Sequence, residues 1–368
     1  MINRRKRNNQ SIKLLYVQRV AAEYRLEFIK GLSEVFELKM LRGLATDRGD
    51  VIDAKLPSYL DILSDVVYLF RNQIWYHPSI RATISDFGPD IVVISPTLRD
   101  LTFWPLLYYK RRLGFKLVGY GMGQMPGRGK LSNFVHTLMQ KIVVKRLDAL
   151  VVYSSAAHDY YRHKLKFKGP IEIAFNAVDI SGFKSKRACE ETKSQFSLVY
   201  VGRIIPEKCL DALIGVVNSR KNLDLKIVGS GDEAYIDELK ELAAPSFSRI
   251  KFLGPLFGLE LNKCLLECDL FVLPSRGGLA LNHAMASGLP VLVSVADGCE
   301  KDLVLEGHTG FYFEDQDFNM MARRIDNLCE DLSELQRVGQ NAAAHIKANF
   351  SIEAMIGKFK STFERILS

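Results

Sequence analysis

Two cations follow a predicted strand in the second half of the chain, within the segment VYVGRIIPEKCLDALI. The strand ends at Gly202, Arg203 follows directly, and Lys208 comes five residues later, before a predicted helix. A glycine lets a ligand approach the backbone, and two fixed cations suit a diphosphate group. The alternative interpretation is that these cations pair with the neighbouring Glu207 or Asp211.

A glycine-rich helix start is the second candidate. In the segment PSRGGLALNHAMASGLP, Gly277 and Gly278 precede a predicted helix that begins near Leu279 and carries His283. The first amide groups of a helix, with their partial positive charge, attract anions. Together with the two cations, this helix start would complete a diphosphate site that uses no metal.

Two further strand ends carry weaker signals. In LKIVGSGDE, Gly229 and Gly231 follow a strand and precede a helix, which fits either a phosphate loop or a plain tight turn. In IKFLGPL, the backbone at Phe252, Leu253 and Gly254 would be free to hydrogen-bond a base. Both segments follow strands, as the two cations do.

The sequence favours no metal site. Its single Asp-x-Asp, from Asp315 to Asp317, follows the last predicted strand and is interpreted as a solvated turn. Cys264 and Cys268 are four residues apart, and no second pair or nearby histidine completes a zinc set. The cysteines are therefore interpreted as buried free thiols.

The elements that would position these residues alternate along all 368 residues: short β-branched runs are separated by segments with helical spacing of apolar residues. This pattern predicts an α/β protein with two doubly wound parallel sheets, hence two Rossmann-like domains. We expect domains at residues 1–180 and 181–349, and a helix at 350–368 that packs back on the first domain. Ligands of such sheets bind at the carboxyl ends of the strands, so the cleft between the domains is the predicted site.

A second group of candidates follows the first strand. The segment VQRVAAEYRLEFIKGL fits either a phosphate-binding loop for donor or acceptor or a solvated helix start, and its candidates are Gln18, Arg19, Tyr24 and Arg25. The glycine-rich segment GYGMGQMPGRGK, with Gly121 and Met122, is typical of a flexible loop near an acceptor.

Charge narrows the class of partner. The formal net charge is +8, and the basic residues are spread along the chain with no aromatic-interleaved stripe. This excludes nucleic acid and leaves phosphorylated ligands or an anionic membrane surface. The segment KLSNFVHTLMQKIVVKR fits a basic amphipathic helix on a membrane, or a domain helix whose end is capped by cations. With the basic start MINRRKRNNQ, which does not fit a secretory signal, we expect a cytoplasmic protein with peripheral membrane contact.

The motifs over about residues 196–315 resemble the family-4 retaining glycosyltransferases, whose architecture is called GT-B. The motifs are VGRIIPEK, IVGSGDE, IKFLGPL, LFVLPS, GLALNHAMASGLPV and EGHTGFYF, in that order. The resemblance implies a UDP- or GDP-sugar as co-substrate, no further cofactor, and a glycan or lipid-linked acceptor in surface polysaccharide synthesis. It implies that Arg203 and Lys208 neutralise the donor diphosphate, while the loop at Phe252 lies near the base. It also implies front-face attack by the acceptor hydroxyl, without an enzyme nucleophile.

Two positions depart from the family pattern. Two glutamates that usually bind the donor sugar and the ribose align with Ser275 and His283. A hydroxyl and an imidazole can hydrogen-bond the same groups, although His283 also fits a packed core position. At its ordinary pKa near 6.5, the imidazole would lose its acceptor within an accessible pH range. Two alternatives stay open: a catalytically degenerate protein that binds nucleotide sugar or glycan, and a GT-B-fold nucleotide-sugar epimerase, which would need the missing carboxylates.

Overall fold

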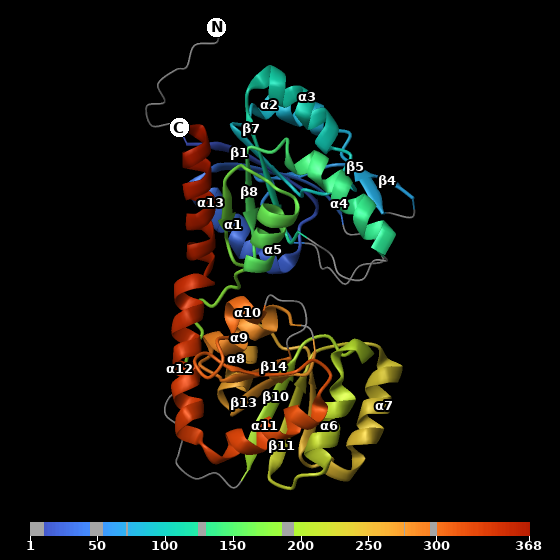
Figure 1. Ribbon diagram of the computed structural model, residues 1–368, viewed down its shortest axis with the longest axis vertical. Coiled ribbons are helices and arrows are strands. Elements are labelled where there is room, and N and C mark those ends of the chain that lie inside the picture. The colour runs from blue at the N-terminus through green and yellow to red at the C-terminus, as the bar shows by residue number, and fades with distance from the viewer. Residues whose placement is uncertain are drawn as a thin grey trace. The chain divides into compact units, whose positions relative to one another are not determined.

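The computed structural model describes residues 11–44, 54–70, 73–123, 130–185, 195–275, 277–294 and 300–368, without the side chains of residues 130–136. The basic start of the chain and residues 124–129 of the glycine-rich loop lie outside these ranges. The chain divides into two compact units, Met1–Asn176 with Ile352–Ser368, and Ala177–Ser351 (Figure 1). Each unit is built on one parallel sheet, and each is described by itself; the predicted cleft between them stays a prediction.

The N-terminal unit has a seven-stranded sheet in the order β3-β2-β1-β6-β7-β8-β9, and every neighbouring pair is parallel. Its central strands are apolar throughout because helices cover both faces, so β6 and β8 are buried at every residue. The strands are β1 (Lys13–Val20), β2 (Glu37–Gly43), β3 (Asp61–Leu63), β6 (Ile91–Ile94), β7 (Lys116–Gly121), β8 (Ala149–Val152) and β9 (Ile171–Ile173).

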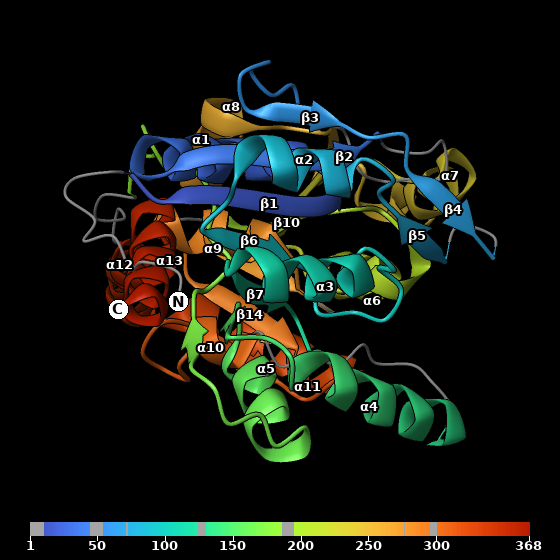
Figure 2. The same cartoon turned by 90° about the horizontal axis from the view of Figure 1, so that it is seen from above.

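Helices lie on both sides of this sheet, as the view from above shows (Figure 2). They are α1 (Leu26–Val35), α2 (Ile80–Phe87), α3 (Phe103–Leu113), α4 (Lys130–Val144), α5 (Ser155–Asp159) and α13 (Ile352–Leu367). Two short turns, η1 (Glu23–Arg25) and η2 (Tyr160–Lys164), join them. An antiparallel hairpin of β4 (Val67–Leu69) and β5 (Ile74–Tyr76) lies outside the main sheet.

Helix α13 belongs to the N-terminal unit although it follows the whole C-terminal unit in sequence. It packs on α1 through aromatic rings: the centroids of Phe28 and Phe359 are 5.3 Å apart, and so are those of Phe36 and Phe363. Phe359 also contacts Tyr120 of β7, again at 5.3 Å. Offset aromatic pairs at this separation stabilise a core beyond the burial of their area, so α13 completes the core of this unit.

The C-terminal unit has a six-stranded parallel sheet in the order β12-β11-β10-β13-β14-β15. Its strands are β10 (Phe196–Val201), β11 (Leu223–Val228), β12 (Ile250–Gly254), β13 (Leu270–Leu273), β14 (Val291–Ser294) and β15 (Phe311–Phe313). Its helices and short turns are η3 (Pro206–Lys208), α6 (Leu210–Asn218), α7 (Glu233–Ala243), η4 (Ala244–Ser246), α8 (Gly258–Leu266), α9 (Leu279–Ala286), α10 (Glu300–Leu303), α11 (Phe318–Glu330) and α12 (Leu332–Asn349).

Both sheets reverse their strand order once. In the N-terminal unit the reversal lies between β1 and β6, and in the C-terminal unit between β10 and β13. At such a point the connections leave to opposite sides and open a crevice outside the carboxyl ends of the two strands. The doubly wound sheets predicted from the sequence are confirmed, and the structure adds β3, β4 and β5, each of three residues. No helix within the described ranges is long and apolar enough to cross a bilayer.

Candidate functional site

The C-terminal candidates meet at the reversal point of their sheet. Strands β10 and β13 pair in parallel through Leu198 with Leu270 and Val199 with Phe271, so their carboxyl ends lie side by side. The end of β10 leads into the loop with the two predicted cations, and the end of β13 leads into the glycine-rich helix start. The structure therefore brings together two segments that lie about 70 residues apart in the sequence, as the parallel arrangement requires.

One hydrogen bond joins these two loops. The Ser275 hydroxyl, which is 8% exposed, donates to the main-chain carbonyl of Glu207 at 2.6 Å. Lys208 follows Glu207 at the end of turn η3, and the next residue, Cys209, has a positive φ of 53°. A positive φ is uncommon for a residue other than glycine, so this turn has a defined shape rather than a generic one. Ser275 thus supports the turn that carries Lys208, and its oxygen can still accept a bond from a ligand.

The glycines after β10 and β11 have a packing role. The Gly202 amide donates to the Val228 carbonyl at 3.0 Å, and the Ile204 amide donates to the Ser230 carbonyl at 2.8 Å, so the ladder continues past both strands. A Cβ at Gly229 would clash with the Gly202 carbonyl oxygen. A Cβ at Gly231 would clash in the same way with the Ile204 carbonyl oxygen. Close backbone approach explains these glycines without a ligand, which favours the tight-turn interpretation over the phosphate loop.

The end of β12 extends the same edge of the sheet. The Gly229 amide donates to the Gly254 carbonyl at 2.9 Å, and Gly254 has a φ of 70° that favours glycine. Leu253 is 39% exposed, while Phe252 is half-buried. The predicted base-binding residues are therefore adjacent to the β11 loop, with one apolar side chain open to a ligand.

The start of α9 is open. Gly278 is extended at the helix N-cap, makes no side-chain capping bond, and has no atom of the described residues within 4 Å of the place where a Cβ would stand. The Gly277 amide, in contrast, donates to the Oε1 atom of Glu300 at 3.1 Å. Glu300 is 1% exposed, and sequence reasoning missed it. Its position after β14, the next strand of the same sheet, is the signal that would have found it.

His283 is packed rather than freely exposed. Its ring lies 5.2 Å from the ring of Phe183 at 31°, and its Nδ1 atom is buried without a hydrogen-bond partner. Burial lowers its pKa to about 4, because desolvation of the imidazolium outweighs the attraction of Asp179. The expectation of an unshifted pKa near 6.5 is therefore wrong. The ring is neutral at pH 7, and a contact of its Nε2 atom with a ribose stays a prediction.

The Asp-x-Asp segment has structural partners. Asp315 accepts a 2.8 Å bond from the Ser294 hydroxyl, and Asp317 caps α11 by accepting a 2.8 Å bond from the Met320 amide. Within the ranges that the structure describes, no three His, Cys, Asp or Glu side chains are grouped to hold a metal ion.

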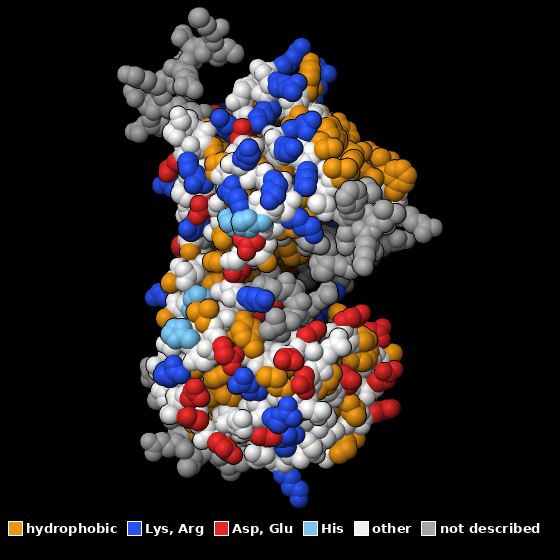
Figure 3. All heavy atoms as spheres, viewed as in Figure 1, with side chains coloured by type: hydrophobic (Ala, Val, Ile, Leu, Met, Phe, Trp, Pro, Cys, Tyr) orange, Lys and Arg blue, Asp and Glu red, His pale blue; other side chains and the backbone are white. Residues whose placement is uncertain are grey.

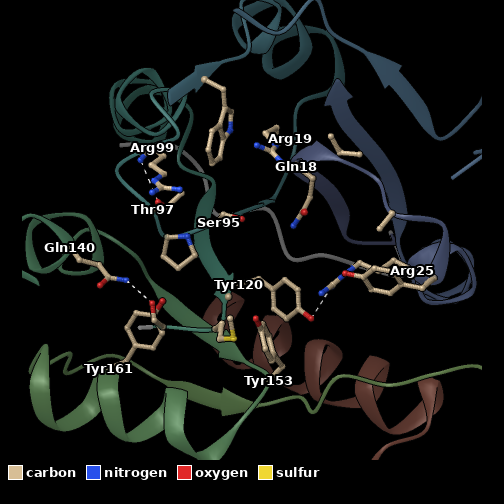
Figure 4. A pocket seen from close by; sticks show the side chains of 18 residues that line it. Gln18, Arg19, Arg25, Ser95, Thr97, Arg99, Tyr120, Gln140, Tyr153 and Tyr161 are labelled. Carbon is tan, nitrogen blue, oxygen red and sulfur yellow. Dashed lines mark hydrogen bonds between the residues drawn. The ribbon is translucent and has the colours of Figure 1, made fainter. Parts of the chain in front are cut away.

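The N-terminal unit contains a cavity of about 440 Å³ at its own reversal point. It opens at the carboxyl ends of β1, β6 and β7, and Figure 4 shows side chains from these strands pointing into it. All six N-terminal candidates line it: Gln18, Arg19, Tyr24, Arg25, Gly121 and Met122. The structure therefore brings together two loops that the sequence analysis had considered separately, while their binding role stays a prediction.

Sequence reasoning missed other residues of this cavity. Arg99, Trp75 and Tyr153 also line it. Trp75 arrives from the β4–β5 hairpin, and its amide donates to the Arg99 carbonyl at 2.9 Å, which joins the hairpin to the loop after β6. Arg99 could have been identified from the sequence because it follows strand β6. No pattern in the sequence indicates that the hairpin contributes to the cavity.

Known proteins share this arrangement. Residues 195–331, within the C-terminal unit, match the family model described as glycosyl transferases group 1. An uncharacterised glycosyltransferase of Methanocaldococcus jannaschii is 26% identical over 290 residues, which cover 74% of this chain and 73% of the relative. The chain is therefore similar to group 1 glycosyltransferases. It is also 24% identical over 329 residues to the capsular polysaccharide biosynthesis glycosyltransferase CapM of Staphylococcus aureus, covering 83% of this chain and 82% of CapM.

The fold of the glycosyltransferase is GT-B. The structure of HepE from Anabaena in complex with UDP superposes with a TM-score of 0.73 at 17% identity, over 96% of this chain and all of HepE (100%). At this level of identity the likeness concerns the fold, and the two Rossmann-like units predicted from the sequence are those of GT-B proteins.

Proposed function

We propose that the glycosyltransferase moves a hexose from a nucleotide-diphosphate sugar to an acceptor hydroxyl, with retention of configuration, in cell-surface polysaccharide or lipid-linked glycan synthesis. One observation carries the proposal: in a group 1 glycosyltransferase unit, the loop with Arg203 and Lys208 and the open helix start at Gly278 follow the adjacent strands β10 and β13. By their names, CapM acts in capsular polysaccharide biosynthesis and HepE binds UDP.

The residues at this edge would stabilise the departing diphosphate. As the bond between the sugar and the diphosphate breaks, negative charge grows on the leaving oxygen. Arg203, Lys208 and the first amides of α9 would act on that charge, and their preorganisation is the source of the rate gain. Since these groups are fixed in the protein, we propose that transfer requires no divalent metal and no enzyme nucleophile.

The other donor contacts follow the strand ends. The backbone at Gly254 and the exposed side chain of Leu253 would lie near the base, and Nε2 of His283 would meet the ribose. Ser275 would face the donor sugar through the lone pairs of its oxygen, because its proton is donated to Glu207.

The N-terminal unit would contact an anionic membrane surface. Figure 3 shows Lys and Arg side chains gathered on one face of this unit, beside a hydrophobic patch. Helix α3 ends in Lys110, Arg111 and Arg112, and α4 exposes Leu138 and Met139 at 53% and 40%. A surface of this composition adsorbs to anionic headgroups while its apolar side chains enter the interface. Flotation with phosphatidylglycerol vesicles but not with phosphatidylcholine vesicles would support this location, and equal recovery with both would reject it.

Nucleotide binding tests the proposed function directly. UDP and GDP are titrated separately into the protein while its melting temperature is recorded, since a ligand of the folded state raises it. We expect one of the two to stabilise the protein, and the corresponding nucleotide sugars to be hydrolysed slowly without an acceptor. Proton NMR of a transferred product then reports its anomeric configuration. A protein that neither nucleotide stabilises would not be a nucleotide-sugar enzyme.

A further inference from the structure

The cavity of the N-terminal unit is strongly cationic. Three arginines, Arg19, Arg25 and Arg99, are among its lining residues, and no aspartate or glutamate is among them. Asp100, which follows Arg99 in the sequence, is 1% exposed and accepts a 3.0 Å hydrogen bond from the Thr102 amide. The counter-charge of Arg19 and Arg25 is therefore expected to come from a ligand.

Arg25 is held in place by a neutral partner. Its Nη1 atom donates to the Tyr120 hydroxyl at 2.9 Å, and its guanidinium carbon lies 5.2 Å from the Tyr120 ring centroid (Figure 4). A tyrosine hydroxyl orients a guanidinium without neutralising it. Tyr16 and Tyr24 also hydrogen-bond the guanidinium without neutralising it, so its charge still attracts a phosphate or carboxylate.

Arg19 stands at the exposed edge of the same cavity. Its guanidinium carbon lies 5.4 Å from the ring centroid of Trp75, and the Trp75 amide is bonded to the Arg99 carbonyl. The cation–π contact limits the rotamers of Arg19 without consuming its charge. Trp75 of the hairpin thus links Arg19 of β1 to Arg99 of the loop after β6. Both arginines lie on the same side of the cavity, as Figure 4 shows.

The rest of the lining fits a sugar. Pro96, Met122 and Tyr153 offer apolar surface, and Gln18 offers its amide group. A volume of about 440 Å³ is within the range of small-ligand pockets, which combine apolar walls with a few polar groups. A saccharide with an attached anion satisfies both parts of this surface.

We propose that this cavity binds the acceptor of the glycosyltransferase, and that the acceptor is a saccharide bearing a phosphate or carboxylate recognised by Arg19 and Arg25. The inference rests on the proposed function, since it names the acceptor class of that reaction. A neutral acceptor would leave the arginines without counter-charge, and the donor diphosphate is assigned to the other unit.

Binding is tested on the full chain, without turnover. Four probes are titrated by ligand-observed NMR and melting curves: glucose 1-phosphate, glucuronic acid, methyl α-glucoside and UDP. The variants are Arg19→Gln and Arg25→Gln. Arg81→Gln is the matched control, because Arg81 is an exposed arginine of α2 in the same unit, outside the cavity.

We expect glucose 1-phosphate or glucuronic acid, or both, to bind at least tenfold more tightly than methyl α-glucoside. The comparison of the two identifies the anion. Either cavity variant should weaken this binding roughly tenfold or more, the scale of a lost hydrogen bond to a charged group, while Arg81→Gln leaves it unchanged. UDP binding should be the same in all four proteins.

Three results would overturn the inference. They are binding of the neutral glucoside as tight as that of the anionic sugars, unchanged binding of the anionic sugars to the cavity variants, and no binding of either anionic sugar to the native protein. Loss of UDP binding in the cavity variants would show that the cavity holds the donor diphosphate, which also overturns it. Failure of the native protein to bind either UDP or GDP would instead reject the proposed function, so the two failures are distinguishable.

Discussion

The Ser275 hydroxyl donates a 2.6 Å hydrogen bond to the Glu207 carbonyl across 68 residues of sequence. The bond joins the end of β13 to turn η3, which carries Lys208. The family resemblance of the sequence implies a glutamate at this position, where it would bind the donor sugar. Here a shorter side chain supports the cation-bearing turn from within the unit.

Ser275→Ala should disturb turnover more than stability. Losing one hydroxyl-to-carbonyl bond costs about 1 kcal/mol of unfolding free energy, but η3 would lose its tie to β13. We expect kcat/KM for the donor to fall about tenfold, as positional errors near a reacting centre allow. Ser219→Ala is the control, because its hydroxyl donates a similar 2.8 Å bond to the Val216 carbonyl at the far end of α6. Equal losses of activity in both variants would contradict a role for this tie.

Arg203→Ala and Lys208→Ala should each lower kcat roughly a hundredfold, the scale of one lost charge-stabilising group. Melting temperatures should change little, since Arg203 is exposed and Lys208 is half-buried. Lys251→Ala, an exposed lysine in β12 of the same unit, serves as the control for surface charge. Near-normal turnover in both cation variants would show that the diphosphate binds elsewhere.

Excess chelator should leave transfer intact, because the proposed diphosphate site uses fixed cations in place of a divalent ion. The measurement compares initial rates with EDTA, with added magnesium and with added manganese. Activity that vanishes with EDTA and returns with either ion would require a carboxylate site that the proposal does not contain.

His283 should make stability fall at acid pH. Its pKa is lowered to about 4 in the folded protein, against about 6.5 in an unfolded chain. Between these values the unfolded chain binds a proton that the folded protein excludes, so stability drops as pH falls below about 6.5 and is unaffected above it. Between pH 7 and pH 5, the free energy of unfolding of the native protein should fall by about 2 kcal/mol more than that of His283→Gln.

Urea unfolding of both proteins at the two pH values measures this difference. His77 also has a pKa lowered to about 4 by burial, but it is present in both proteins and cancels. Over pH 6–8 the affinity for UDP should change with pH in the same way in both proteins, since His283 stays neutral there and only the phosphate of UDP titrates. A pH-independent difference between the two proteins would show that His283 is solvated.

Phe359→Ala should destabilise the N-terminal unit by about 3–5 kcal/mol, the usual cost of removing a fully buried aromatic side chain. Phe359 is 0% exposed and contacts Phe28, Phe363 and Tyr120. Phe247→Ala is the control, because that ring is 82% exposed and should cost less than about 0.5 kcal/mol. Chemical unfolding monitored by circular dichroism compares the two, and equal stabilities would mean that α13 is not part of this core.

Much of the fold was predictable because buried parallel strands read as continuous apolar runs. Strand β6 is Ile-Val-Val-Ile and strand β13 is Leu-Phe-Val-Leu, with every residue buried. Strands β3, β4 and β5 were not predicted, because each has only three residues, all exposed or half-buried, and therefore carries no periodic signal. A run of three residues gains its hydrogen bonds from tertiary context, which local patterns do not encode.

The candidate sites divide in the same way. Strand-end positions gave Arg203, Lys208 and Gly278 on the C-terminal sheet and Arg19 on the N-terminal one, because parallel sheets collect their carboxyl ends at one edge. The packing of His283 against Phe183 was not predictable, since Phe183 lies in the irregular segment before the unit's first strand. The cavity with the three arginines was likewise not predictable, because the β4–β5 hairpin contributes Trp75 to its lining.

The return of α13 to the first unit has a consequence for synthesis on the ribosome. Phe359 supports Tyr120, and Tyr120 orients Arg25 in the cavity. At about 5–20 residues per second, translation of the intervening unit takes roughly ten to thirty-five seconds. During that interval the nascent first unit exposes the rings of Phe28 and Phe36, which α13 later covers. The half of the protein that is translated first thus needs the segment that is translated last to complete its core.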